Sequence, residues 1–254
     1  MKGGLLVPWD GTTFSECALA AAYRLGLPGR VLRVLVPSSP PALPGVAGSL
    51  GLRLTEGRRN QALEQEAREA LDALQLPPGW ERELLCGEPA EQITEAARGQ
   101  AAELIVMASH GRRDGKRWLL GSVAEGVVRR STCPVLLLRP ELESTDFSRV
   151  LVPVDGSQPG FEVLQAVRRW LPPQAEVRAL HVGGELEFPV GVPGRVVEGE
   201  PVEVILQQAL HWPCQLLALS THGRSGFRRL VLGSVAESVA RRAHCAVMLF
   251  PRRE

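Results

Sequence analysis

The chain has 254 residues, enough for one or two domains, and 44% hydrophobic with 22% charged residues is typical of a globular protein with a buried core. Its 29 basic and 28 acidic side chains nearly cancel, so charge gives no reason to expect a nucleic acid or an anionic membrane as partner. No apolar run approaches the roughly 18–20 residues of a membrane helix, and the first residues do not resemble a signal peptide, so we expect a cytoplasmic protein.

The first half of the sequence alternates short apolar runs with amphipathic segments. In chain order, the pattern predicts strand 5–8, helix 13–25, strand 31–36, helix 53–76, strand 80–86, helix 89–100, strand 104–108, helix 122–130 and strand 135–138. The strands are nearly all apolar and alternate with helices. This arrangement favours a parallel sheet covered by helices on both faces.

The second half repeats the first. Three motifs recur in the same order, the first at an offset of 145 residues and the other two at an offset of 112. The matching segments are 6–11 with 151–156, 87–89 with 199–201, and 121–125 with 233–237. The change of offset indicates that the second copy lacks about 33 residues between its second strand and the Gly-Glu-Pro motif.

The missing piece of the second copy is its second helix, because the Gly/Pro-rich segment 183–194 shows no helical pattern. One face of the second sheet is then expected to be less covered, unless a loop, the other domain or a partner buries it. A linker rich in Pro, Glu, Ser, Thr and Asp lies near 140–148. We therefore expect two domains, at 1–143 and 147–254.

Chemically capable residues follow the predicted strands in both copies. Asp10 and Asp155 come directly after the first strands, and ligands of open α/β sheets bind beyond such carboxyl ends. A carboxylate placed there can accept hydrogen bonds from a ribose hydroxyl or an adenine amine. It can equally be the N-cap of the helix that follows, and the sequence leaves both alternatives open.

The helices at 122 and 234 begin with the pattern Ser-x-x-Glu. Ser122 with Glu125, and Ser234 with Glu237, have the spacing of capping boxes. The free backbone amides and the dipole of a helix start also attract anions, so a phosphate site is the alternative. Basic loops precede both helices and are either solvated surface or phosphate ligands; they contain Arg112, Arg113, Lys116 and Arg117, and Arg224, Arg228 and Arg229.

Other common sites find little support in the sequence. His110 and His222 have no metal-ligand partners at a suitable spacing, and the five cysteines form no CxxC pair. Neither a P-loop nor a nucleophile elbow is present. We therefore expect no metal centre and assign no catalytic residue.

At these residues the chain resembles the universal stress protein family in its tandem form. The nucleotide signature of that family is Gly, two residues, Gly, nine residues, Gly, and then Ser or Thr. Segments 111–122 and 223–234 match its last three elements, whereas Ala108 and Ser220 stand in place of the first glycine.

The resemblance implies an α/β fold of two tandem, doubly wound, open parallel five-stranded sheets of the adenine nucleotide alpha hydrolase-like type. Each has strand order 3-2-1-4-5, and the second copy lacks one helix. It also implies that the fifth strands, 135–138 and 246–250, pair so that the chain is a covalent pseudo-dimer, and further homodimerisation is compatible with it.

The resemblance further implies a site for ATP, or for ADP or AMP, with Mg²⁺ on the phosphates left open. The aspartates would meet the ribose or adenine, the valines at 36 and 182 would line the adenine pocket, and the glycine, arginine and serine residues would hold phosphates. Trp9 would stack on adenine or fill its pocket. The residues expected at the nucleotide are Pro8, Trp9, Asp10, Val36, Gly111, Arg112, Gly121, Ser122 and Val123, and Pro153, Val154, Asp155, Val182, Gly223, Arg224, Gly233, Ser234 and Val235.

Three functions are compatible with this sequence. The leading hypothesis is an adenine-nucleotide-binding stress or signalling protein with little or no turnover. A stress adaptor or chaperone-like scaffold that binds no nucleotide stays open because of Ala108, Ser220 and Trp9. A slow ATPase or adenine-nucleotide transferase is supported only by analogy with related folds.

Overall fold

The structure, a computed structural model, describes residues 3–36, 50–109, 120–139, 146–221 and 232–251. In the helix that begins at residue 50, the side chains are described from residue 59 onward. The first half contains β1 (Leu5–Pro8), α1 (Thr13–Arg24), β2 (Gly29–Leu35), α2 (Leu50–Asp72), β3 (Glu81–Cys86), α3 (Pro89–Gly99), β4 (Leu104–Ala108), α4 (Ser122–Arg130) and β5 (Val135–Leu138). The second half contains β6 (Arg149–Val154), α5 (Gln158–Ala166), a 3-10 helix η1 (Val167–Trp170), β7 (Glu176–Val182), β8 (Gly194–Val197), α6 (Pro201–His211), β9 (Leu216–Ser220), α7 (Ser234–Arg242) and β10 (Ala246–Phe250).

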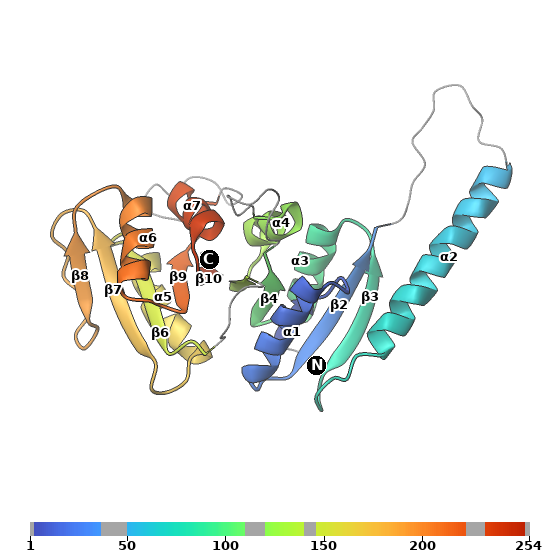
Figure 1. The fold of residues 1–254 in the computed structure, drawn as a ribbon, viewed down its shortest axis with the longest axis horizontal. Coiled ribbons are helices and arrows are strands. Elements are labelled where there is room, and N and C mark those ends of the chain that lie inside the picture. Colours follow the sequence, from blue (N-terminus) through green and yellow to red (C-terminus); the bar gives the residue numbers. More distant parts are fainter. Residues whose placement is uncertain (1–2, 37–49, 110–119, 140–145, 222–231, 252–254) are drawn as a thin grey trace, which may run out of the picture.

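The strands of the described residues form one ten-stranded sheet (Figure 1). Its order is β3-β2-β1-β4-β5-β10-β9-β6-β7-β8, so each half has the expected order 3-2-1-4-5. Neighbouring strands are parallel within each half. The two fifth strands pair antiparallel, with Val247 opposite Leu137, which confirms the predicted pairing.

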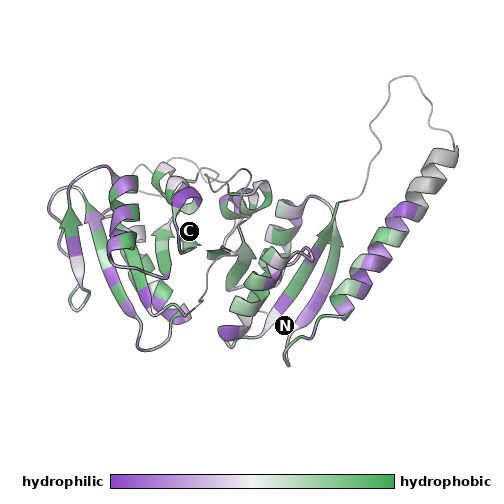
Figure 2. Ribbon diagram, in the orientation of Figure 1, coloured by the Kyte–Doolittle hydropathy of each residue, from purple (hydrophilic) through white to green (hydrophobic). Residues whose placement is uncertain are grey.

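The sheet is buried on both faces because its central strands β4, β5 and β10 are apolar at every position. Successive residues of β4 alternate between two clusters: Ile105 and Met107 belong to the cluster that contains residues of α3, α4, α6 and α7, whereas Leu104 and Val106 belong to the one that contains residues of α1, α2 and α5. Figure 2 shows hydrophobic residues along the middle of the sheet and more hydrophilic ones toward its outer strands. Strands β3 and β8 form the two edges of the sheet.

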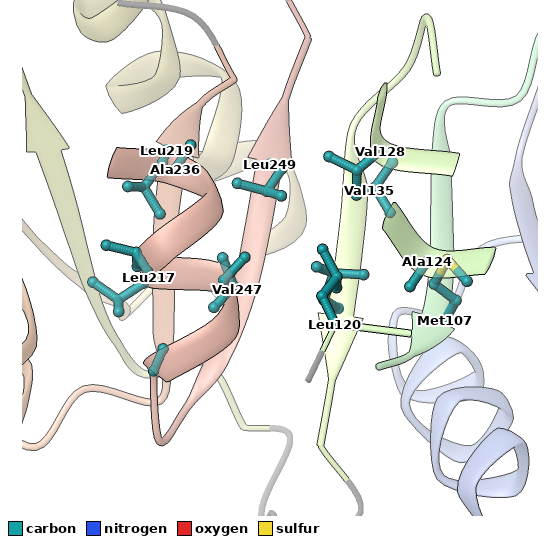
Figure 3. Close-up of a cluster of buried hydrophobic side chains, with 14 of the residues drawn as sticks. Met107, Leu120, Ala124, Val128, Val135, Leu217, Leu219, Ala236, Val247 and Leu249 are labelled. Atoms are coloured by element: carbon teal, nitrogen blue, oxygen red, sulfur yellow. The ribbon is translucent and has the colours of Figure 1, made fainter. Parts of the chain in front are cut away.

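The two halves share one core. The cluster under α3, α4, α6 and α7 contains Val128 and Val135 of the first half together with Leu217 and Leu249 of the second (Figure 3). Pairing β5 with β10 also removes an exposed edge from each half, and such edges are prone to aggregation. The predicted second domain begins with a buried residue, Phe147, packed in the opposite cluster.

Helix α2 ends at Asp72, four residues before the predicted boundary. The guanidinium of Arg82, on β3, donates to the carbonyl oxygen of Leu71 at 2.8 Å and also to that of Leu74. The carbonyl of Leu71 also accepts from the amide of Leu74 at 3.2 Å, and Leu74 itself lies beyond the helix. Arg82 therefore binds carbonyl groups at and just after the end of α2. Apolar periodicity continues through Leu74 and Leu76, so it placed the end of this helix too late.

The second half connects β7 to β8 through residues 183–193, which contain no helix. This confirms the predicted loss of one helix. Of the three expected ways to cover the face left by that helix, the loop is the one observed, since Leu186, Phe188 and Val192 pack against the core cluster. The ring of Phe188 lies so close to Gly194 that a Cβ atom there would stand 2.3 Å from it.

Candidate functional site

Each half has a cavity at the carboxyl ends of its strands. The cavity of the second half has a volume of about 270 Å³, and that of the first half has about 190 Å³. The second-half cavity lies just below the range of about 300–1,000 Å³ that is usual for small-molecule sites, and the first-half cavity is clearly smaller than that range. We call them the second and the first cavity.

The second cavity brings together residues that are far apart in the sequence. Asp155 follows β6, Val182 ends β7, and Ser220 ends β9 and is followed by Thr221. The start of α7 supplies another wall. The other lining residues are Pro153, Val154, Gly160, Leu180, Pro201, Ile205, Leu219, Gly233, Ser234, Val235 and Ala236.

The capping-box prediction is wrong for both helices. Gly121 and Gly233 are the N-caps of α4 and α7, and neither helix has a side-chain capping bond. Ser122 and Ser234 are already the first helical residues. In each helix, the first helical hydrogen bond runs from the amide of the fourth residue, Glu125 or Glu237, to the carbonyl oxygen of the N-cap glycine, at 2.9 Å. The amides of the first three helical residues therefore have no helical acceptor.

The start of α7 is held in place by the end of β9. The amide of Gly233 donates to the carbonyl oxygen of Thr221 at 2.8 Å, and a Cβ atom at this glycine would lie 3.1 Å from the same oxygen. Thr221 itself donates its amide to Phe250 on β10. The open first turn of α7 is therefore fixed against two central strands.

The aspartates are not N-caps, because Thr12 caps α1 and Ser157 caps α5. Asp10 Oδ1 accepts hydrogen bonds from the amide of Thr12 at 3.0 Å, from its hydroxyl at 2.6 Å and from the hydroxyl of Ser15 at 2.7 Å. Asp155 Oδ1 accepts from the amide of Ser157 at 3.0 Å and from its hydroxyl. These hydrogen bonds hold both aspartates in turns at the walls of their cavities, since Asp155 lines the second cavity and Asp10 the first.

Val36 was assigned to the adenine pocket incorrectly. It lies beyond the end of β2, is 65% exposed and does not line the first cavity, whereas Val34 does. The register explains the error: Leu32 pairs with Pro8 as Leu180 pairs with Pro153, so the offset is 148 at the second strands. Val182 therefore corresponds to Val34, and the deletion that follows in the second copy is 36 rather than 33 residues.

Trp9 lines the first cavity, but its ring packs mainly with the cluster on the α1 side of the sheet. The guanidinium of Arg33 lies over the ring, 5.3 Å from its centroid. Arginine thus occupies one face of the indole, in a cation–π contact. Val154, its counterpart, packs in the same cluster and lines the second cavity.

The first cavity differs from the second at the helix start. Of the first turn of α4, Val123 lines the cavity, whereas Gly121 and Ser122 are absent from its described walls. Phe14 and Met107 supply bulky apolar lining instead. The described residues therefore present a more open helix start to the second cavity than to the first.

The glutamates of the supposed capping boxes bind arginines instead. Glu125 lies 2.8 Å from Arg129 and 2.8 Å from Arg241, and Glu237 lies 3.0 Å from Arg241 and 3.4 Å from Arg129. We call these four half-buried side chains the quartet. The hydrogen bond from Arg129, helped by the charge of Arg241, holds the pKa of Glu125 below its ordinary value despite partial burial.

Several predicted residues cannot be placed. Gly111, Arg112, Gly223 and Arg224 lie outside the described residues. Within the described ranges, no group of three His, Cys, Asp or Glu side chains is arranged to hold a metal ion. No helix in those ranges has the length and apolarity needed to cross a membrane.

The sequence analysis missed the walls supplied by α3 and α6. Pro89 and Ile93 line the first cavity, and Pro201 and Ile205 line the second. Their signal was available, because the repeated Gly-Glu-Pro motif opens both helices and an apolar residue follows four positions later.

Comparison with known proteins agrees with this architecture. A universal stress protein of Thermus aquaticus is 34% identical over 135 residues, which cover 53% of this chain and 97% of that protein. A universal stress protein of Mycolicibacterium smegmatis is 28% identical and is matched over 97% of this chain and 96% of its own length. The solved universal stress protein of Archaeoglobus fulgidus shares the fold, with a TM-score of 0.69, 23% identity and 98% coverage of both chains.

The family match covers both halves. The sequence model of the universal stress protein family matches residues 4–139 and 185–251. The gap between the two matches contains β6 and β7. This chain, with its duplicated strand order and paired fifth strands, belongs to the universal stress protein family.

Proposed function

We propose that this chain binds an adenine nucleotide, ATP or its products ADP and AMP, in the second cavity. One observation carries the proposal: Asp155 and the open first turn of α7 lie on the walls of a single cavity. We further propose that the protein acts by binding, as a cytoplasmic regulator of a stress response, rather than by turnover.

The start of α7 suits the phosphates. Its dipole and its first amides favour an anion, and no side-chain cap competes for them. Gly233 lacks a Cβ atom, which lets a ligand approach the backbone closely. A Mg²⁺ ion would arrive with the phosphates.

The opposite part of the cavity suits the nucleoside. Leu180, Val182 and Leu219 provide apolar walls for a base. The carboxylate of Asp155, oriented by its turn, can accept a hydrogen bond from a ribose hydroxyl or an adenine amine. Few polar groups among apolar walls are the usual composition of a small-molecule site.

The first half favours a different candidate function. Its cavity is smaller, and only Val123 of the α4 start lines it. We therefore propose that the chain holds one nucleotide, and that the first half serves as an adaptor or scaffold domain.

Calorimetric titration tests this proposal with ATP, MgATP, ADP, AMP and adenosine. We expect one nucleotide per chain. Asp155→Ala should abolish binding, whereas the matched Asp10→Ala should leave it nearly unchanged. Failure to bind any of these ligands at millimolar concentration would refute the proposal, and steady release of phosphate from bound ATP would replace a binding function with an ATPase.

A further inference from the structure

The glutamates of the quartet lie close to the starts of their helices. Glu125 is the fourth residue of α4, and Glu237 is the fourth residue of α7. A carboxylate in the first turn stabilises a helix, but it also offsets the positive potential that would attract a phosphate. Anion binding at either start therefore depends on how well these carboxylates are neutralised.

Neutralisation is shared between the two halves. Each arginine reaches its own helix's glutamate through Nε and Nη2, at 3.1 and 2.8 Å for Arg129 and at 3.2 and 3.0 Å for Arg241. The same Nη2 atoms reach across to the other half, Arg241 to Glu125 at 2.8 Å and Arg129 to Glu237 at 3.4 Å. Two positive and two negative charges thus form one closed set.

We propose that the quartet sets the phosphate affinity of the nucleotide site jointly, so that Arg129 of the first half supports phosphate binding in the second. This inference rests on the proposed function. Loss of either arginine leaves the quartet with one net negative charge. Because Arg241 contacts both carboxylates, that charge is then shared by the starts of both helices. Arg129 is accordingly a positioning residue that acts through Glu237 and Arg241.

The experiment compares ATP with adenosine, which has no phosphate. In the full-length chain at low ionic strength, Arg129→Gln should lower the ratio of ATP to adenosine affinity by about two- to fivefold, the scale of one charge near a helix end. Arg130→Gln is the matched control, since Arg130 is the adjacent residue of α4 and is not a member of the quartet. It should leave the ratio unchanged.

A rescue distinguishes the shared quartet from a simpler pairing within α4. Adding Glu125→Gln or Glu237→Gln to Arg129→Gln restores neutrality, and either double variant should recover the wild-type ratio. If Glu125→Gln restores the ratio and Glu237→Gln does not, the charge is not shared between the two helices and the inference is overturned. An unchanged ratio in Arg129→Gln overturns it as well, because Arg129 would then act only within its own helix.

Two further outcomes distinguish failure of this inference from failure of the proposed function. If Arg129→Gln weakens ATP and adenosine equally, its role is to hold the halves together, and the inference is wrong while the proposed function stands. If the wild-type chain binds neither ligand, the proposed function fails and the inference fails with it. Thermal melting of each variant identifies any loss of folding.

Discussion

Replacing Ser234 with glutamate should stabilise the protein while weakening phosphate binding. Ser234 is exposed, is the first residue of α7 and lines the second cavity. A carboxylate at this position interacts favourably with the helix dipole but repels a bound phosphate. The two effects have opposite signs, which few substitutions at a binding site produce.

The magnitudes follow from the position of the charge. One exposed carboxylate at a helix start adds about 0.3–1 kcal/mol to the free energy of unfolding. Its repulsion of a phosphate about 4 Å away is about 1 kcal/mol in the dielectric of water and about 4 kcal/mol at the effective dielectric constant of a surface site, so affinity for ATP should fall by at least about fivefold. Adenosine affinity should change by less than about twofold, because adenosine carries no charge.

Urea unfolding measures the first effect, and calorimetric titration with ATP and adenosine measures the second. Ser122→Glu is the matched control, since it places the same charge at the start of α4, where the serine does not line the first cavity. It should stabilise the chain and leave nucleotide affinity nearly unchanged. Equal losses of ATP and adenosine affinity in Ser234→Glu, or no loss of either, would refute phosphate binding at α7.

Three other predictions concern stability. Gly194→Ala should lower the free energy of unfolding by about 1–3 kcal/mol, because its Cβ atom would meet the ring of Phe188; Gly184→Ala, with nothing nearby, is the control for the same urea measurement. Glu125 has a pKa lowered by its arginine partners, so its ionised form stabilises the fold above its ordinary pKa of 4.5, and this contribution disappears as the pH falls through the folded-state pKa. Glu125→Gln should therefore lose less stability than wild type between about pH 5 and pH 3, and parallel pH profiles would contradict this. Arg82→Met should speed hydrogen exchange at the end of α2 and destabilise the chain by about 0.5–1.5 kcal/mol, since the carbonyl groups of Leu71 and Leu74 lose their hydrogen bonds from the guanidinium; unchanged exchange there would show that these bonds are unimportant.

The sequence by itself determined the architecture of this protein. Apolar periodicity is a local property, so it predicted the elements of the first half with boundary errors of a few residues. The duplication was read directly from recurring motifs, and the missing helix followed from the change of offset. The aspartates and the glycine–serine pairs were found because both copies place them where apolar strands end or helices begin.

Tertiary structure alone decided the details of the site. Val34, and not Val36, is the counterpart of Val182 in the first cavity. The reason is that the connection between the first and the second strand is three residues longer in the second copy than in the first, and this shifts the strand register. The capping assignment depended on backbone geometry: Gly121 is extended, with φ −60° and ψ 151°, and this makes the following serine the first helical residue.

The partners of the glutamates also required the folded chain. Arg129 lies 108 residues from Glu237, and Arg241 lies 116 residues from Glu125, so no local pattern links them. The sequence shows each Glu–Arg pair at a spacing of four within its own helix. Their joining into one quartet follows from the antiparallel pairing of β5 with β10, which brings α4 and α7 together across the centre of the sheet.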